Sequence, residues 1–94
     1  MILLHEPTLI GNEKKYLNDC IKTNWISTSG KYIDLFEKEI RNYTGSKYVV
    51  AVNSGTSALH ISLLLSNVKP KDEVIVPTVS FIASINSIKY CKAN

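Results

Sequence analysis

The chain has 94 residues, of which 45% are apolar, so it can build one small core and therefore one domain or part of one. Its 11 Lys and Arg residues against 8 Asp and Glu give a net charge of +3, and the basic residues are scattered, which argues against a nucleic-acid partner. The apolar start, residues 1–4, is too short for a signal peptide and no stretch is long enough to span a membrane, so we expect a cytoplasmic protein without a membrane partner.

The first 30 residues are predicted to form an arm, a helix and a loop. Residues 1–10 lack periodicity, so we expect an extended arm whose few apolar side chains pack against something else. A helix is expected from Gly11 to about Thr23, because apolar side chains gather on one of its faces. The loop that follows, NWISTSG, ends at Gly30, a residue suited to a tight bend.

A second amphipathic helix is predicted from Lys31 to Tyr43, so that residues 11–44 hold two helices. Its aromatic and apolar side chains recur at steps of three and four residues. On the polar side, two pairs of opposite charge are spaced for i,i+4 ion pairs, namely Asp34 with Lys38 and Glu37 with Arg41. The Thr44-Gly45 step is expected to end this helix.

Residues 45–94 are predicted to begin a parallel sheet with the order β-α-β-α. Residues 48–52 and 73–76 are apolar on both faces, as in strands covered above and below. Helices are expected at Ala58–Leu65, with almost no polar face, and from Ser80 to about Tyr90. The order demands a right-handed crossover connection and therefore an α/β fold class.

Two strands alone cannot form such a sheet, because each of them needs partners at its edges and on its faces. The sequence stops at Lys92-Ala93-Asn94, where a third strand should begin. We therefore expect residues 1–94 to be the amino-terminal piece of a longer protein, or the product of a truncated gene model.

Small polar residues follow the first predicted strand, in the run Asn53-Ser54-Gly55-Thr56-Ser57. In a parallel sheet this corner lies at the ligand-binding edge, and a helix that starts there presents unpaired N–H groups to an anion. Glycine permits close approach of a phosphate, and the hydroxyls add donors, although Ser and Thr are equally typical of a simple helix cap. The P-loop, dinucleotide-binding and nucleophile-elbow motifs are all absent.

Phe81 follows the second predicted strand and should emerge at the same edge of the sheet. There its ring could stack on a flat ligand, or it could simply belong to the core. Histidine and cysteine receive structural roles: His60 is interpreted as a satisfied core histidine, and Cys20 and Cys91 as small buried hydrophobes without metal or redox spacing.

Three stretches together resemble the sugar aminotransferases of the DegT/DnrJ/StrS family. They are WISTSGKYIDLFEKEI at 25–40, YVVAVNSGTSALHISLL at 48–64 and KDEVIVPTVSFIASINSI at 71–88. The resemblance implies pyridoxal 5'-phosphate (PLP) as cofactor and the three-layer, mostly parallel sheet of the PLP-dependent transferase fold, the aspartate aminotransferase-like fold. Residues 1–94 would then be the amino-terminal part of the large PLP-binding domain.

The resemblance also assigns site residues. In the family, the positions matching Gly55, Thr56 and Ser57 hold the cofactor phosphate, and the aromatic matching Phe81 lies against the pyridine ring. Many relatives have Trp where this chain has Phe81, which keeps a stacking face. The resemblance places the lysine that forms the Schiff base beyond residue 94, so residues 1–94 alone should not transaminate.

The implied activity of the intact protein is transfer of an amino group from glutamate to the ketone of a nucleotide-linked 4-keto-6-deoxy sugar, for surface glycans. The segment at 25–37 looks closest to members that make legionaminic-type amino sugars. The resemblance further implies a homodimer with active sites at the subunit interface. Three alternatives stay open: a dehydratase of the same family with histidine in place of the lysine, a non-enzymatic phosphate-binding module, and a non-functional truncation product.

Overall fold

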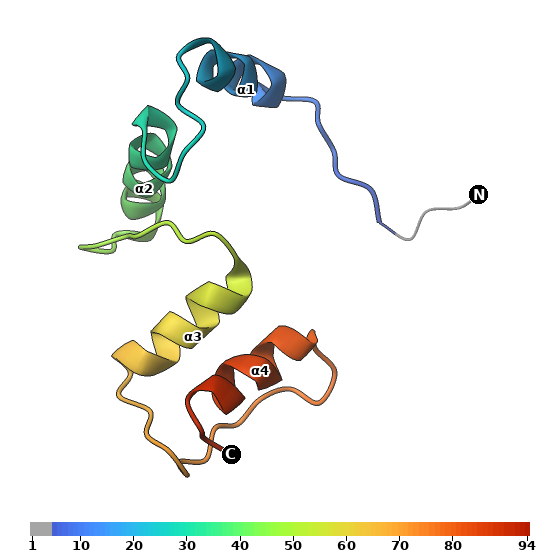
Figure 1. Cartoon of the computed structure of the whole chain (residues 1–94), viewed down its shortest axis with the longest axis vertical. Coiled ribbons are helices and arrows are strands. Elements are labelled where there is room, and N and C mark those ends of the chain that lie inside the picture. Colours follow the sequence, from blue (N-terminus) through green and yellow to red (C-terminus); the bar gives the residue numbers. More distant parts are fainter. Residues whose placement is uncertain (1–4) are drawn as a thin grey trace. The chain divides into compact units, whose positions relative to one another are not determined.

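The computed structural model describes residues 5–94, and these residues contain four α-helices (Figure 1). The chain divides into two units, one ending at Ala51 and the other covering Val52–Asn94. The predicted arm of residues 1–10 lies partly outside the described residues. Its described part, residues 5–10, has no regular secondary structure and is exposed.

The first unit contains both of the helices predicted there, α1 (Glu13–Lys22) and α2 (Lys31–Thr44). Glu13 in the first turn of α1 and Lys22 in its last turn both complement the helix dipole. Helix α2 ends as expected at Gly45, which takes the left-handed conformation, with φ 70° and ψ 8°, that glycine adopts without steric cost. The sequence therefore places both helices to within two residues.

The ion pairs expected on the polar side of α2 do not form. Glu37 instead accepts a hydrogen bond from the backbone N–H of Ala51, at 2.7 Å from Oε1, and so ties the end of this unit to its second helix. Among residues 5–94 the only ion pair is between Lys31 and Asp19, at 2.7 Å. A tertiary partner on another segment has replaced the local pairing that helix spacing favours, because exposed i,i+4 pairs stabilise a helix only slightly.

The second unit contains α3 (Gly55–Leu65) and α4 (Ile82–Tyr90), which pack against each other. Helix α3 begins three residues before the predicted start, because Ser54 caps it. The core of the unit consists of three buried residues, Ile88, Cys91 and Ala93. Four half-buried apolar side chains surround this core: Leu63, Val68, Val74 and Val76.

The prediction of two strands is wrong for this structure, since residues 48–52 and 73–76 form none and the described chain has no strand at all. The physical reason is that a strand exists only through hydrogen bonds to a neighbouring strand, and these segments lack a full-length neighbour. The α/β fold class is therefore not seen in residues 5–94. The prediction that α3 is buried is also wrong, because none of its residues is buried.

One short stretch does have the hydrogen bonds of a parallel sheet. The N–H of Asn94 donates to the carbonyl of Asp72 at 2.7 Å, and the carbonyl of Asn94 accepts from the N–H of Val74 at 2.8 Å. A third bond joins the N–H of Lys71 to the carbonyl of Lys92 at 2.9 Å. In a parallel pair, one residue bonds to the two residues that flank its partner on the neighbouring segment, as Asn94 bonds to Asp72 and Val74 here. The pairing is too short to form a strand.

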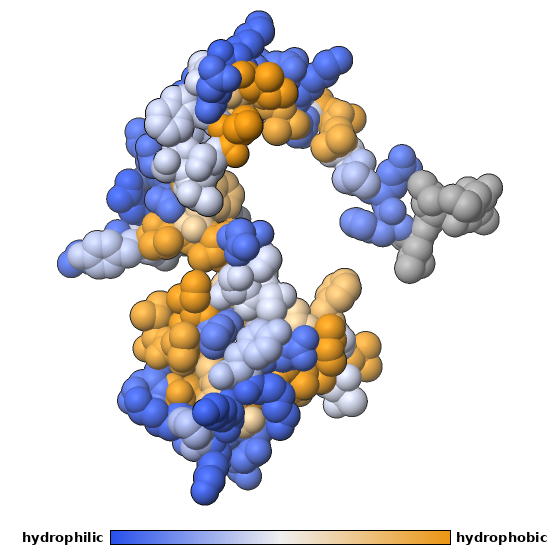
Figure 2. Space-filling model, in the orientation of Figure 1, coloured by the Kyte–Doolittle hydropathy of each residue, from blue (hydrophilic) through white to orange (hydrophobic). Residues whose placement is uncertain are grey.

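Large apolar side chains stay exposed on both units, and Figure 2 shows them in orange. Ile75 and Val50, which were expected to be covered as strand residues, are 101% and 76% exposed. Of the helices in residues 5–94, none combines the length and the hydrophobicity that a membrane crossing needs. The same residues contain no group of three or more potential metal ligands.

Candidate functional site

The first turn of α3 is built by the cap residue Ser54. Its backbone is extended, with φ −159° and ψ 156°, and its Oγ accepts a hydrogen bond from the N–H of Ser57 at 3.2 Å. The hydroxyl of Ser54 in turn donates to that of Ser57 at 3.0 Å, and the carbonyl of Ser54 accepts from the N–H of Ala58. This arrangement turns the small polar run predicted from the sequence into the amino-terminal turn of a helix.

Gly55, Thr56 and Ser57 are thereby the first three residues of α3. The N–H groups of the first two have no helical carbonyl to bond, and the dipole adds positive potential at this end. A Cβ built on Gly55 would meet nothing within 4 Å, so the approach to these amides is open. With the hydroxyls of Thr56 and Ser57 beside them, these groups can bind a phosphate through several donors.

Phe81 lies at the amino-terminal end of α4, as its cap residue. Figure 1 shows α3 and α4 side by side and running in the same direction, so both amino-terminal turns lie toward one end of the unit. The Phe81 side chain is 87% exposed, and within the described chain its ring pairs with no other aromatic ring. The structure thus brings Gly55, Thr56 and Ser57 together in one turn and leaves the Phe81 ring free on the neighbouring helix.

Ser87 connects α4 to the first turn of α3. Its side chain is the only one among the described residues that is fully buried. Its hydroxyl donates to the carbonyl of Ala83 at 2.8 Å, within α4, and reaches the carbonyl of Thr56 at 3.3 Å. His60 is half-buried and packs edge-on against Tyr90 with the ring centroids 5.4 Å apart, so it is not the core histidine that was expected.

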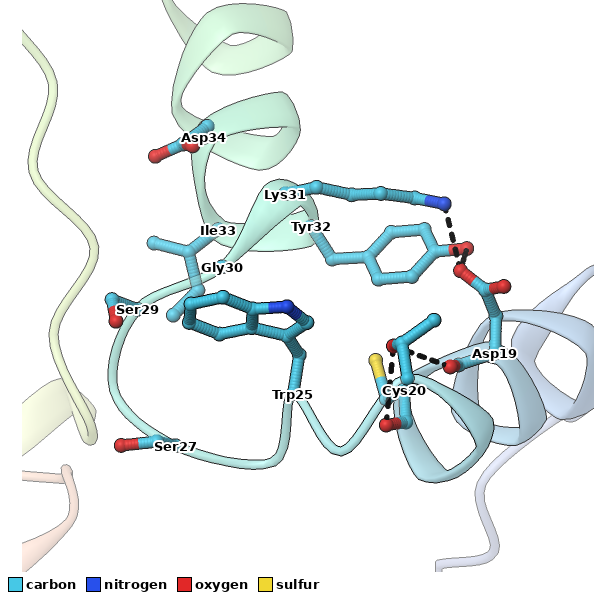
Figure 3. A pocket seen from close by; sticks show the side chains of 11 residues that line it. Asp19, Cys20, Trp25, Ser27, Ser29, Gly30, Lys31, Tyr32, Ile33 and Asp34 are labelled. Atoms are coloured by element: carbon cyan, nitrogen blue, oxygen red, sulfur yellow. Dashed lines mark hydrogen bonds and ion pairs between the residues drawn. The ribbon is translucent and has the colours of Figure 1, made fainter.

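A second concave site lies in the first unit, where α1, the loop and α2 enclose a pocket of about 640 Å³ (Figure 3). The indole of Trp25 lies across it, close to Gly30, and Cys20 and Ile33 contribute apolar lining. On one side, the Asp19 carboxylate accepts hydrogen bonds from Lys31 Nζ at 2.7 Å and Tyr32 OH at 2.9 Å. We call these three residues the Asp19 cluster.

The Asp19 cluster shifts the pKa of each of its members. The hydrogen bond from Lys31 lowers the pKa of Asp19, and the bond from Tyr32 adds to this. The same bond raises the pKa of Lys31. Partial burial, followed by the bond to Asp19, raises the pKa of Tyr32. At neutral pH, Asp19 and Lys31 are therefore charged and Tyr32 is neutral, and the cluster joins α1 to the first turn of α2.

Sequence reasoning missed three features of these sites. It started α3 at Ala58, although Ser54 is a residue type that favours the N-cap position. It placed Tyr32 in the apolar stripe of α2, whereas the Tyr32 hydroxyl bonds Asp19. It gave no role to Ser87, for which the only signal is a small polar residue at an otherwise apolar position of a helix.

Comparison with known proteins assigns the chain to a family. The sequence profile of the DegT/DnrJ/EryC1/StrS aminotransferase family matches residues 7–94, which include all four helices of the described residues. The chain therefore belongs to this family, as the three resembling stretches predict.

Three relatives show how similar the chain is to individual named proteins. The chain is 48% identical over 93 residues to a GDP-perosamine synthase of Vibrio cholerae and 45% identical over 92 residues to one of Escherichia coli O157:H7. It is 37% identical over 92 residues to EpsN of Bacillus subtilis (strain 168), whose provisional name is pyridoxal phosphate-dependent aminotransferase. These matches cover 98 to 99% of the chain but only 24 to 25% of each relative. The chain thus spans about a quarter of the length of these relatives.

Proposed function

We propose that residues 1–94 form the amino-terminal part of the large PLP-binding domain of a sugar aminotransferase. The observation that carries this proposal is the first turn of α3, open at Gly55, within a family match that covers residues 7–94. The described residues fit the phosphate of PLP, because unpaired amides, two hydroxyls and the positive end of the helix dipole belong to one turn that is open at Gly55. We use the term full-length protein for a chain that contains residues 1–94 and has the length of the relatives.

In the proposed function each site residue has a binding task. The N–H groups of Gly55 and Thr56 and the hydroxyls of Thr56 and Ser57 hold the phosphate, and Ser54 keeps the turn in shape. The ring of Phe81 covers the pyridine ring of the cofactor. When bound, PLP supplies an electron sink that stabilises negative charge next to the reacting nitrogen. Residues 1–94 orient this group and exclude water from one side of it.

The proposed reaction transfers an amino group from glutamate to the ketone of a nucleotide-linked 4-keto-6-deoxy sugar. The names of the relatives favour GDP as the nucleotide, and they favour perosamine-type over legionaminic-type products. We also propose a cytoplasmic homodimer with its active sites at the subunit interface. Sedimentation of the full-length protein at micromolar concentration should give a dimer, and a monomer would contradict this part of the proposal.

We propose that the lysine that binds the cofactor aldehyde lies outside residues 1–94. The four lysines of the second unit support this, because two follow the carboxyl end of α3 and two lie at the carboxyl end of α4: Lys69, Lys71, Lys89 and Lys92. Helix α3 has 11 residues and is roughly 16 Å long, so its far end is distant from the phosphate turn.

The phosphate turn is tested by changing its hydroxyls in the full-length protein. The double change Thr56→Ala with Ser57→Ala removes two donors and should weaken PLP binding by about tenfold or more, measured by spectroscopic titration. Phe81→Leu should weaken binding by about three- to tenfold, because an aromatic contact is replaced by an aliphatic one. Ser62→Ala, an exposed position of α3 beyond the first turns, is the matched control. Unchanged affinity in both variants would contradict the proposed site.

The alternatives differ in the fate of the cofactor and the sugar. Treatment with borohydride in the presence of PLP should fix the cofactor to a lysine of the full-length aminotransferase, detectable as a peptide mass shift. A dehydratase with histidine at that position would give no such peptide and would return a deoxygenated sugar. A phosphate-binding module without enzymatic activity would bind inorganic phosphate and PLP equally well. An aminated sugar with glutamate as donor is the expected result, and GDP-linked substrate should compete better than UDP- or dTDP-linked substrate.

A further inference from the structure

The burial of Ser87 is unusual for its residue type and position. Serine is a poor helix former compared with alanine, yet it occupies a fully buried position in the middle of α4. An alanine would fill nearly the same space and would favour the helix more. A serine at this position is therefore explained only if its hydroxyl bonds a group outside α4. The carbonyl of Thr56, at 3.3 Å, is such a group.

The contact with Thr56 bears on the phosphate turn through the peptide bond. The carbonyl of Thr56 and the N–H of Ser57 belong to the same peptide group. A hydrogen bond accepted by the carbonyl polarises this group and makes its N–H a stronger donor to Ser54 Oγ, which is the bond that caps the turn. The Ser87 hydroxyl has one proton, which it shares between the carbonyls of Ala83 and Thr56, at 2.8 Å and 3.3 Å. The same contact fixes α4, and with it the backbone of Phe81, against the turn.

We infer that Ser87 is a positioning residue for the cofactor phosphate: through the carbonyl of Thr56 it sets the orientation of the first turn of α3. This inference rests on the proposed function, since it needs a phosphate bound at that turn. Ser87 itself is fully buried and does not touch the phosphate. It acts on the anion only by holding the turn in shape, through the peptide group between Thr56 and Ser57 and the bond of that group to Ser54.

The test compares two ligands that differ only in the phosphate. Pyridoxal and PLP carry the same aldehyde and ring, so the ratio of their dissociation constants isolates the contribution of the phosphate. In the full-length protein, Ser87→Ala should reduce the preference for PLP over pyridoxal by about fivefold, the order expected for one lost hydrogen bond. The melting temperature should be unchanged or higher, because alanine favours the helix.

Two further variants separate the hydroxyl from its surroundings. Ser87→Thr keeps a hydroxyl that can contact the carbonyl of Thr56 as well as that of Ala83, and it should keep the preference for PLP. Ser84→Ala, one turn earlier on α4, removes a hydroxyl that contacts Ser80 at 3.2 Å instead of α3, and it should leave the ratio unchanged.

The outcomes distinguish a failure of the inference about Ser87 from a failure of the proposed phosphate site. If Ser87→Ala keeps the parent ratio, or if Ser84→Ala lowers it equally, the inference about Ser87 is overturned while the phosphate turn stands. If Ser87→Thr loses the preference together with Ser87→Ala, packing and not the hydroxyl is responsible, which also overturns it. If the unchanged protein binds pyridoxal as tightly as PLP, the proposed phosphate site fails, and the inference fails with it.

Discussion

Gly30 has a backbone conformation that other residues avoid. Its φ of 145° and ψ of 167° lie in a region that is essentially restricted to glycine, and it directly precedes α2. A Cβ built there would lie 3.5 Å from the Trp25 ring, which is ordinary contact, so any penalty comes from the backbone and not from crowding. The position at which the loop enters α2 therefore depends on this glycine.

We predict that Gly30→Ala lowers the free energy of unfolding of the full-length protein by about 2 kcal/mol, because the strained φ and ψ must be kept or the loop must change course. Chemical denaturation measures this. Gly45→Asn is the control, because asparagine tolerates the left-handed conformation of Gly45 and should cost well under 1 kcal/mol by comparison, about a few tenths. Equal losses in the two variants would contradict the special role of Gly30.

The Asp19 cluster should give a pH-dependent contact between α1 and α2. The pKa of Asp19 is lowered in the folded state, first by the hydrogen bond from Lys31. Its contribution to stability is therefore complete above the unfolded pKa near 3.8 and is lost as the pH falls through the lower folded value. The pKa of Lys31 and that of Tyr32 are raised, so their contributions are complete below the unfolded values of 10.5 and 10.0 and are lost as the pH rises through the higher folded values.

Titration of the Asp19 carboxyl by NMR in the full-length protein should give a pKa below 3.8. In Lys31→Met the pKa should rise toward its usual value, because the largest cause of the shift is removed. Tyr32→Phe should raise it less. A pKa of Asp19 that is the same in the parent and in Lys31→Met would show that the contact is absent in solution.

Helix α3 illustrates how one cap residue determines where an element begins. Its residues have little polar character beyond the first turn, so hydrophobic periodicity gives no sharp amino-terminal limit. The hydrogen bond from the N–H of Ser57 to Ser54 Oγ fixes that limit at Gly55. The three residues that this adds to the predicted helix are the ones expected to bind the phosphate.

We predict that Ser54→Ala weakens the first turn of α3 by about 1 kcal/mol, because the N–H of Ser57 loses its acceptor. Hydrogen exchange should show about fivefold faster exchange of the Ser57 amide, with little change at the carboxyl end of the helix. Ser66→Ala, at the other end of α3, provides the matched comparison. Exchange that is unchanged in Ser54→Ala would mean that another group caps the helix.

All buried residues of the described chain lie between positions 87 and 93, in the second unit. No residue of 5–51 is buried, and the buried apolar residues of the second unit are Ile88, Cys91 and Ala93. A core of this size cannot offset the conformational entropy of about 90 ordered residues. Apolar side chains such as Val50 and Ile75 are instead available to neighbouring segments.

We predict that residues 1–94 expressed alone show helical circular dichroism without a cooperative thermal transition. The reason is that helices persist locally while the predicted strands lack neighbours. A sigmoidal melt with dispersed amide signals in an NMR spectrum would contradict this prediction. The full-length protein under the same conditions is the control and should unfold cooperatively.

Local signals were sufficient to predict that the four helices exist, although they did not locate the start of α3. The amphipathic spacing in residues 31–43 and the glycine at position 45 predicted α2 almost to the residue, because both act within a few turns of the chain. The polar corner at residues 53–57 was likewise visible as a helix start with hydroxyls. In the same way, the three resembling stretches were enough to predict the family, which the profile match confirms.

Long-range contacts were not visible in the pattern. The i,i+4 spacing of Glu37 and Arg41 does not indicate that the Glu37 carboxylate bonds the backbone N–H of Ala51 instead of pairing with Arg41. Nor does the sequence show that Asp19 joins two residues of α2, or that Ser87 faces Thr56. Each of these contacts joins residues 12 or more positions apart, where side-chain periodicity carries no information.

The amino acid order was therefore enough for the presence of the four helices and for the family, because helix formation depends on neighbours three and four residues away. Tertiary structure decided which polar groups meet, and it left residues 48–52 and 73–76 without strand structure. The reason is that a sheet is a property of paired chains: apolar, β-branched residues make a segment able to pair, but only a neighbour at the right distance makes it a strand.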